Sequence, residues 1–204
     1  MKYFILFVIV FITLVFLTWL TTARAAGPAK TDDITGYAEF TLLEPVPAVE
    51  GLIGPVLDNS STSEHALYDY GWTDSLTVGY FTASTEINII EEDSKVIALA
   101  VYFEDLVLEF DDLEQVALFV AELRIMFLDK YSEDLVAVDL FDFGDSDNYS
   151  TWYTGALVLI DEDGDMLAYS WNGYSLCILY TTVPFQAVMQ EFETNNLEET
   201  KDKI

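Results

Sequence analysis

The sequence contains one cysteine and one histidine among 204 residues. These counts rule out an internal disulfide framework and a zinc cluster built from Cys and His ligands. Cys177 lies in the apolar run Leu176–Tyr180, without the electropositive surroundings that make a thiol reactive. We therefore expect Cys177 to pack as a small apolar side chain, with an intermolecular disulfide as the alternative in an oxidising compartment.

Basic residues are also scarce, because 8 Lys and Arg stand against 36 Asp and Glu, for a net charge of −28. Such a charge repels phosphates, so the sequence argues against nucleic-acid binding and against docking on anionic membrane surfaces. Two explanations of the acidity stay open. One is a solvated surface adapted to a saline habitat, where salt screens the self-repulsion. The other is a docking surface for a cationic protein or peptide.

Several catalytic signatures are missing. The chain has no Gly-rich phosphate loop and no Gly-x-Ser-x-Gly nucleophile elbow, and the one histidine, His65, lies in a polar stretch where we expect it to be solvated. The content of 52% hydrophobic residues is nevertheless high enough for a sizeable core. We find no internal repeat, and the length fits a single domain.

The N-terminus has the three-part pattern of a secretory signal peptide. Lys2 precedes an apolar run over residues 4–20, and the small residues that follow suit a cut after Ala25. The prediction is a signal peptide over 1–25, a linker over 26–36, an acidic domain over 37–192 and a polar tail over 193–204. The protein would then be exported to the periplasm or the exterior. The alternative is that residues 4–20 stay uncleaved as an anchor, which would be the only membrane contact.

Within the domain, strand-like and helix-like patterns alternate in blocks. The 3,4 spacing of apolar residues predicts a helix over 111–130 with Asp111 as N-cap, and Pro184 opens a C-terminal helical segment. The fold class is α+β, a largely antiparallel sheet of about six to seven strands with one long amphipathic helix packed on one face and a C-terminal helical segment. Strands are predicted at 37–43, 76–82, 86–90, 95–103, 135–141, 152–160, 166–171 and 176–182.

The composition of residues 51–74 predicts a long surface loop. Residues 51–74 combine several glycines, Pro55 and the polar run Asp58–Glu64. Because long loops often carry function, this segment is the predicted binding surface.

Two acidic clusters are candidate calcium sites, because calcium prefers carboxylate oxygens. The first surrounds Gly144 and the second surrounds Gly164, and neither has the spacing of an EF-hand loop. For each, the alternative is a turn that uses Asp and Gly for backbone reasons alone. The candidate ligands are Asp142, Asp145, Asp147 and Asn148 in the first cluster, and Asp161, Asp163 and Asp165 in the second.

These observations favour an exported, highly acidic, non-enzymatic binding or interaction domain with a cationic protein or peptide as partner. It requires no cofactor, and calcium is the candidate ion. A calcium-stabilised structural or adhesive module is the alternative. A hydrolase that uses paired carboxylates, with tryptophans such as Trp72, Trp152 and Trp171 as sugar platforms, is the second alternative.

Overall fold

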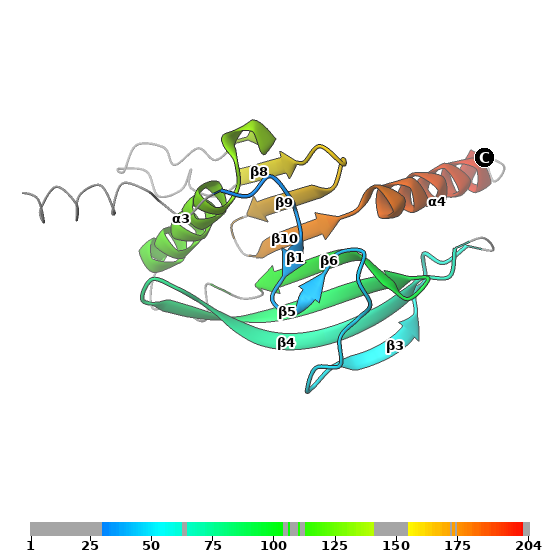
Figure 1. The fold of residues 1–204 in the computed structure, drawn as a ribbon, viewed down its shortest axis with the longest axis horizontal. Helices are drawn as coiled ribbons and strands as arrows, with labels where there is room; N and C mark the ends of the chain where they lie inside the picture. The colour runs from blue at the N-terminus through cyan, green and yellow to red at the C-terminus, as the bar shows by residue number, and fades with distance from the viewer. Residues whose placement is uncertain are drawn as a thin grey trace, which may run out of the picture.

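The computed structural model describes residues 30–62, 65–103, 106, 110, 113–140, 155–171, 173 and 175–201. The predicted signal peptide and the predicted N-cap Asp111 lie outside these residues. Across the described part, no helix combines the length and the apolar character needed to cross a membrane. The described chain forms an eight-stranded antiparallel sheet, a small two-stranded hairpin and two long helices (Figure 1).

All neighbouring strands of the large sheet are antiparallel, and their order is β3-β4-β5-β6-β10-β9-β8-β7. A separate hairpin pairs β1 (Gly36–Tyr37) with β2 (Phe40–Thr41). The eight strands of the large sheet are β3 (Ile53–Leu57), β4 (Tyr68–Val78), β5 (Phe81–Glu92), β6 (Lys95–Phe103), β7 (Val136–Asp139), β8 (Gly155–Ile160), β9 (Met166–Trp171) and β10 (Leu176–Thr181).

The chain order contains a topological repeat that the sequence does not reveal. Strands β3 to β6 form a meander followed by helix α3 (Leu113–Lys130), and strands β7 to β10 form a second meander followed by helix α4 (Val183–Lys201). The two meanders meet where the last strand of each pairs with the other, with Ile178 opposite Val101. The predicted α+β architecture is confirmed, with eight strands in the sheet.

Helix α3 packs its apolar stripe on one face of the sheet, as its spacing predicted. Val116, Phe119, Val120, Leu123 and Phe127 are all buried in the main core. The contact also has a polar component, because the Tyr169 hydroxyl of β9 donates a hydrogen bond of 2.6 Å to the Val120 carbonyl oxygen. A buried phenol needs such a partner, so this bond fixes α3 against the centre of the second meander.

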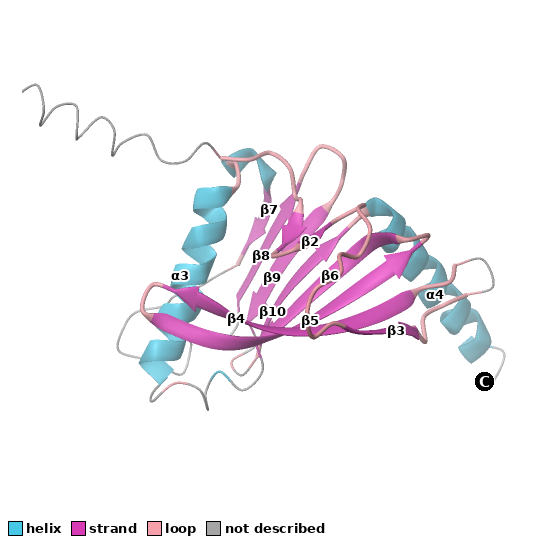
Figure 2. Cartoon of the chain, turned by 60° about the horizontal axis from the view of Figure 1, so that its bottom comes forward, coloured by secondary structure: helices cyan, strands magenta, loops and turns pink. Residues whose placement is uncertain are grey.

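Helix α4 reaches the sheet at its other end and on its opposite face. In Figures 1 and 2, α3 and α4 lie at opposite ends of the sheet. Phe185 and Val188 of α4 pack in a separate small cluster with Ile90 of β5, whereas Ile89 belongs to the main core. Because neighbouring strand residues point to opposite faces, the two helices contact different faces. Helix α4 also continues to Lys201, through the segment predicted to be a polar tail.

Two strand predictions were wrong at turns, for the same reason. The predicted strand 76–82 contains the turn between β4 and β5, where Gly79 has a φ of 59°. The predicted strand 37–43 is likewise split into β1 and β2. In both places, residues of high strand propensity stand on each side of a very short turn, so composition gave little sign of the break.

The prediction of one long loop over 51–74 was also wrong. Ile53–Leu57 forms the edge strand β3, and the segment from Tyr68 onward already belongs to β4. Among the described residues of this segment, those outside strands are 51–52, 58–62 and 65–67. The reason is that β4 extends to 11 residues and gives the glycine-containing segment before it a strand partner.

Candidate functional site

The edge strand β3 presents an unusual apolar surface for so acidic a chain. All five of its residues are exposed. The side chains of Ile53, Val56 and Leu57 have exposed fractions of 71%, 62% and 60%. Tyr68 of β4, which pairs with Leu57, adds a fourth exposed apolar side chain. Ile53 and Val56 lie on the face of their partners Gly71 and Asp69, whereas Leu57 and its partner Tyr68 lie on the other face. We call Ile53, Val56, Leu57 and Tyr68 the β3 patch, which therefore covers both faces of the sheet edge, and exposed apolar side chains gathered in this way are typical of an interaction site.

Local backbone chemistry keeps β3 at the edge of the sheet. Gly54 has a φ of 124°, and a Cβ atom there would lie 2.8 Å from the Asp69 carbonyl oxygen, so only glycine fits. Pro55 has no N–H to donate, and the pairing with β4 shifts register between Ile53 and Val56. Proline and an irregular register both discourage the addition of a further strand. The β3 patch is therefore suited to contact through its side chains rather than through a continued ladder.

Carboxylates border the patch. Asp69 pairs with Val56 across β3 and β4, which places the two side chains next to each other on one face. The Asp69 atom Oδ1 is buried without a hydrogen-bond partner. Burial raises the pKa of Asp69 above its ordinary value, and the nearby charge of Asp58 raises it further, while the Tyr70 N–H opposes the shift. The ionised Asp69 is thus held beside the patch at a cost in stability.

The raised pKa of Asp69 predicts a pH-dependent stability. A carboxyl group whose pKa is raised by folding stabilises the native state when protonated, and this contribution is lost as the pH rises through its native pKa. Replacing Asp69 with Asn keeps an acceptor for the Tyr70 N–H and removes the charge. We expect Asp69→Asn to raise Tm by a few degrees at pH 8, and the gain to shrink as the pH is lowered toward 4.5. Thermal unfolding across this range measures it, and a lower Tm for the variant at pH 8 would contradict the assignment.

The connection from β3 to β4 is held by hydrogen bonds. The Ser60 N–H donates to Asp58 Oδ1 at 2.6 Å, and the Ser61 hydroxyl exchanges bonds with the N–H and carbonyl groups of Leu67 at 3.0 and 3.2 Å. These short-range bonds form a compact turn of the kind that Ser and Asp favour. The turn therefore supports the position of Leu57 and Tyr68 in the β3 patch.

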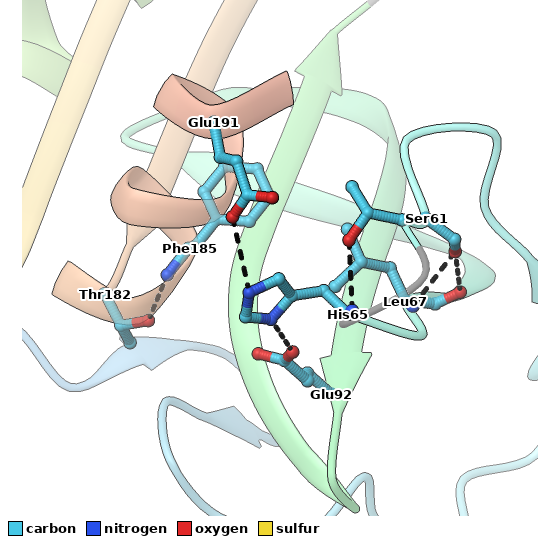
Figure 3. Close-up of polar contacts among 8 residues, drawn as sticks. Ser61, His65, Leu67, Glu92, Thr182, Phe185 and Glu191 are labelled. Carbon is cyan, nitrogen blue, oxygen red and sulfur yellow. Dashed lines mark hydrogen bonds and ion pairs between the residues drawn. The ribbon is translucent and has the colours of Figure 1, made fainter. Parts of the chain in front are cut away.

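His65 links this turn to the rest of the fold, as Figure 3 shows. Its Nδ1 lies 2.6 Å from Glu92 Oε1 at the end of β5, and its Nε2 lies 3.7 Å from Glu191 Oε2 on α4. The expectation that His65 would be merely solvated was therefore wrong. Because both ring nitrogens face carboxylates, the arrangement suits an ion pair joining three elements better than a base beside a nucleophile.

The acids around Gly164 form the turn between β8 and β9. Asp161 Oδ1 accepts hydrogen bonds from the Asp163 and Asp165 N–H groups at 3.1 and 3.0 Å, and its Oδ2 accepts one from the Ile34 N–H at 3.1 Å. Asp165 Oδ1 accepts the Val183 N–H at the start of α4. Burial is the main cause that raises the pKa of Asp165. The Asp161 and Asp165 carboxylates thus have backbone partners, as expected of a structural turn.

The other predicted candidates contribute less to a site. Asp142, Asp145, Asp147, Asn148 and Trp152 lie outside the described residues. Within the part of the chain that is described, no three His, Cys, Asp or Glu side chains form a group that could hold a metal ion. Burial raises the pKa of the Cys177 thiol, so the residue is a poor nucleophile.

The tryptophans of the described chain pack in or against the main core. Trp171 is buried. The Trp72 ring packs on Phe40 with ring centroids 5.3 Å apart, and its Nε1 donates to the Glu50 carbonyl oxygen at 3.0 Å. A sugar platform needs an exposed ring face beside carboxylates. Neither ring therefore favours a carbohydrate site.

The comparisons with known proteins add no functional information. No protein-family model matches the chain, and neither the curated proteins nor the solved structures give a match. The candidate site therefore rests on the residues of this chain alone.

Proposed function

We propose that this protein is an exported, non-enzymatic interaction domain that binds a cationic partner with apolar side chains, and that the β3 patch is its docking surface. The observation that carries the proposal is the combination of exposed Ile53, Val56 and Leu57 in a chain with a net charge of −28. An apolar patch needs a partner that offers apolar area in return. The surrounding negative field selects partners with positive charge and accelerates their approach.

The acids beside the patch support the same partner chemistry. Burial and the charge of Asp58 both raise the pKa of Asp69, and the buried Asp69 Oδ1 has no hydrogen-bond partner. A lysine or arginine of a partner near these two carboxylates would offset their negative charge. Such a partner therefore gains both apolar contact with Val56 and charge compensation at the neighbouring position.

The test is the affinity for a short synthetic peptide of alternating Lys and Leu, measured by titration calorimetry on the full chain. The variant Ile53→Ser/Val56→Ser removes two apolar side chains without changing the net charge. We expect it to bind at least about tenfold more weakly, because each buried aliphatic side chain contributes roughly 1 kcal/mol or more.

A matched control is available on α3, where Leu118 and Ile125 have exposed fractions of 45% and 51%. The variant Leu118→Ser/Ile125→Ser also replaces two exposed apolar side chains with Ser, and it should bind the peptide like the wild type. A peptide with Glu in place of Lys should not bind. Equal losses in the two double variants, or no binding of the Lys–Leu peptide, would contradict the proposal.

A further inference from the structure

A pocket of about 230 Å³ lies between helix α3, strand β1 and the sheet, on the face that carries the main core. It is separate from the β3 patch, because its sheet residue Leu76 and the patch residue Tyr68 stand at opposite ends of β4. The volume is below the range of about 300–1,000 Å³ that is typical for drug-sized ligands. Its ligand would therefore be a small molecule. The lining side chains that matter most are Tyr37, Leu123, Met126, Phe127, Lys130 and Tyr180.

Helix periodicity explains how α3 supplies one wall. Leu123, Met126, Phe127 and Lys130 stand at spacings of three and four residues, which places them along one side of the helix. The opposite wall comes from β1, where Gly36 approaches the Phe40 carbonyl oxygen so closely that a Cβ atom has no room. The walls are mostly apolar, and only the last residue of the helix brings a positive charge to them.

Lys130 is unusual in this chain, which has only 8 basic residues. Its Nζ lies 4.8 Å from the centre of the Tyr131 ring, a cation–π contact that holds the ammonium group near the pocket. The structure therefore keeps a cation at the rim of an apolar pocket, within a strongly acidic molecule. A ligand that uses both features has an apolar body and one negative charge.

The second polar group of the pocket sets the orientation of such a ligand. Burial raises the pKa of Tyr37 to about 12, and the charge of Asp74 adds to the shift, so its hydroxyl stays protonated at neutral pH. Because Asp74 is negative and acts on Tyr37, the Tyr37 side of the pocket disfavours an anion. The anionic end of a ligand is therefore placed at Lys130, and its apolar body between Leu123, Phe127 and the Tyr180 ring.

From this arrangement we propose that the pocket binds a small apolar monocarboxylate, with Lys130 as the cation that pairs with the carboxylate. This binding function is additional to the docking of a cationic partner on the β3 patch. Of the side chains that line the pocket, Met126 and Lys130 are exposed, whereas Leu123, Phe127 and Tyr180 are packed in the core.

The test uses octanoate, its neutral analogue octanamide and the cation octylamine, each titrated into the full chain by calorimetry. Octanoate should bind with one site, and more tightly than octylamine. The variant Lys130→Met keeps a side chain of similar length and should weaken octanoate by about fivefold, the effect expected for a partly exposed ion pair. It should leave octanamide unchanged.

Lys95→Met is the matched control, since Lys95 begins β6 and does not line the pocket. It loses the same charge and should bind octanoate like the wild type. Equal weakening by Lys95→Met and Lys130→Met would assign the effect to net charge and overturn the proposal. Tighter binding of octylamine, or no binding of octanoate, would overturn it as well. The Lys–Leu peptide experiment is independent of these outcomes, because it probes β3.

Discussion

Replacing Phe119 with Ala is expected to lower the free energy of unfolding by about 3–5 kcal/mol, the usual cost of truncating a buried phenylalanine. Phe119 is fully buried in the middle of α3. Its ring lies 5.6 Å from that of Phe103 on β6 and 5.5 Å from that of Phe110, measured between centroids. The substitution leaves a cavity where the helix joins the first meander, so the lost contacts cannot be replaced without movement of α3.

The neighbouring residue provides the control. Leu118 has an exposed fraction of 45%, and Leu118→Ala should change the stability by less than about 0.5 kcal/mol. Urea unfolding of both variants, with equal m values, gives the comparison. If the two substitutions had similar effects, the helix would not pack on the sheet with the face described above.

Asp161→Ala is expected to have the second largest effect, a loss of about 2–3 kcal/mol. Three backbone N–H groups, those of Ile34, Asp163 and Asp165, donate to its two carboxylate oxygens. Each such bond contributes about 0.5–1.5 kcal/mol net. The bond to Ile34 also ties the N-terminal segment to the β8–β9 turn, so its removal should loosen both.

Two further substitutions at the turn give a graded comparison. Asp161→Asn keeps one acceptor oxygen and should have an intermediate effect. Asp163 is exposed, and Asp163→Ala keeps the backbone N–H that donates to Asp161 Oδ1. This variant should therefore change the free energy of unfolding by less than about 0.5 kcal/mol. Chemical unfolding without calcium measures all three.

The same three variants test the alternative of calcium binding at the turn. If calcium were the reason for the acidic cluster, Asp163→Ala would abolish a calcium-dependent rise in Tm. The structural assignment would then fail.

The sequence predicted the elements whose pattern is strong. The boundaries of β6 and β9 agree with the predicted strands 95–103 and 166–171, because a turn precedes each strand and both are rich in strand-forming residues. The stripe of α3 was predicted because its apolar residues follow the helical period without interruption. Local signals of this kind need no knowledge of the remaining chain.

The strand order could not be predicted in the same way. Strand β10 pairs with β6, although α3 and strands β7 to β9 lie between them in the chain. This pairing depends on long-range contacts such as Ile178 opposite Val101. The segment Ile53–Leu57 was misassigned because its Gly and Pro are typical of loops, and only the length of β4 makes it a strand. Edge strands tolerate both residues, so composition cannot separate them from loops.

The candidate site was predicted only in outline. The segment 51–74 was expected to carry the binding surface, and the β3 patch lies within it, but on a strand. The apolar run Leu52–Leu57 could not by itself predict an exposed surface, because apolar strand residues are as a rule buried. Their exposure follows from the position of β3 at the edge of the sheet.

The pocket at Lys130 gave no sequence signal either. Tyr37 and Tyr180 are separated from Lys130 by many residues, and only the tertiary fold brings them to one place. A lysine at the end of a helix is ordinarily explained by the helix dipole alone. The proposed role of Lys130 as a cation beside an apolar pocket depends on β1 and the sheet, and no local sequence pattern predicts that these elements lie next to Lys130.

Docking of a cationic, apolar partner on β3 can be located by hydrogen exchange of the full chain, measured with and without the Lys–Leu peptide. We expect slower exchange in residues 50–58 and 67–70 when the peptide is bound, and unchanged exchange in α3, because docking covers the β3 edge alone. Protection confined to other elements, such as β8 and β9, would show that the peptide does not dock on β3.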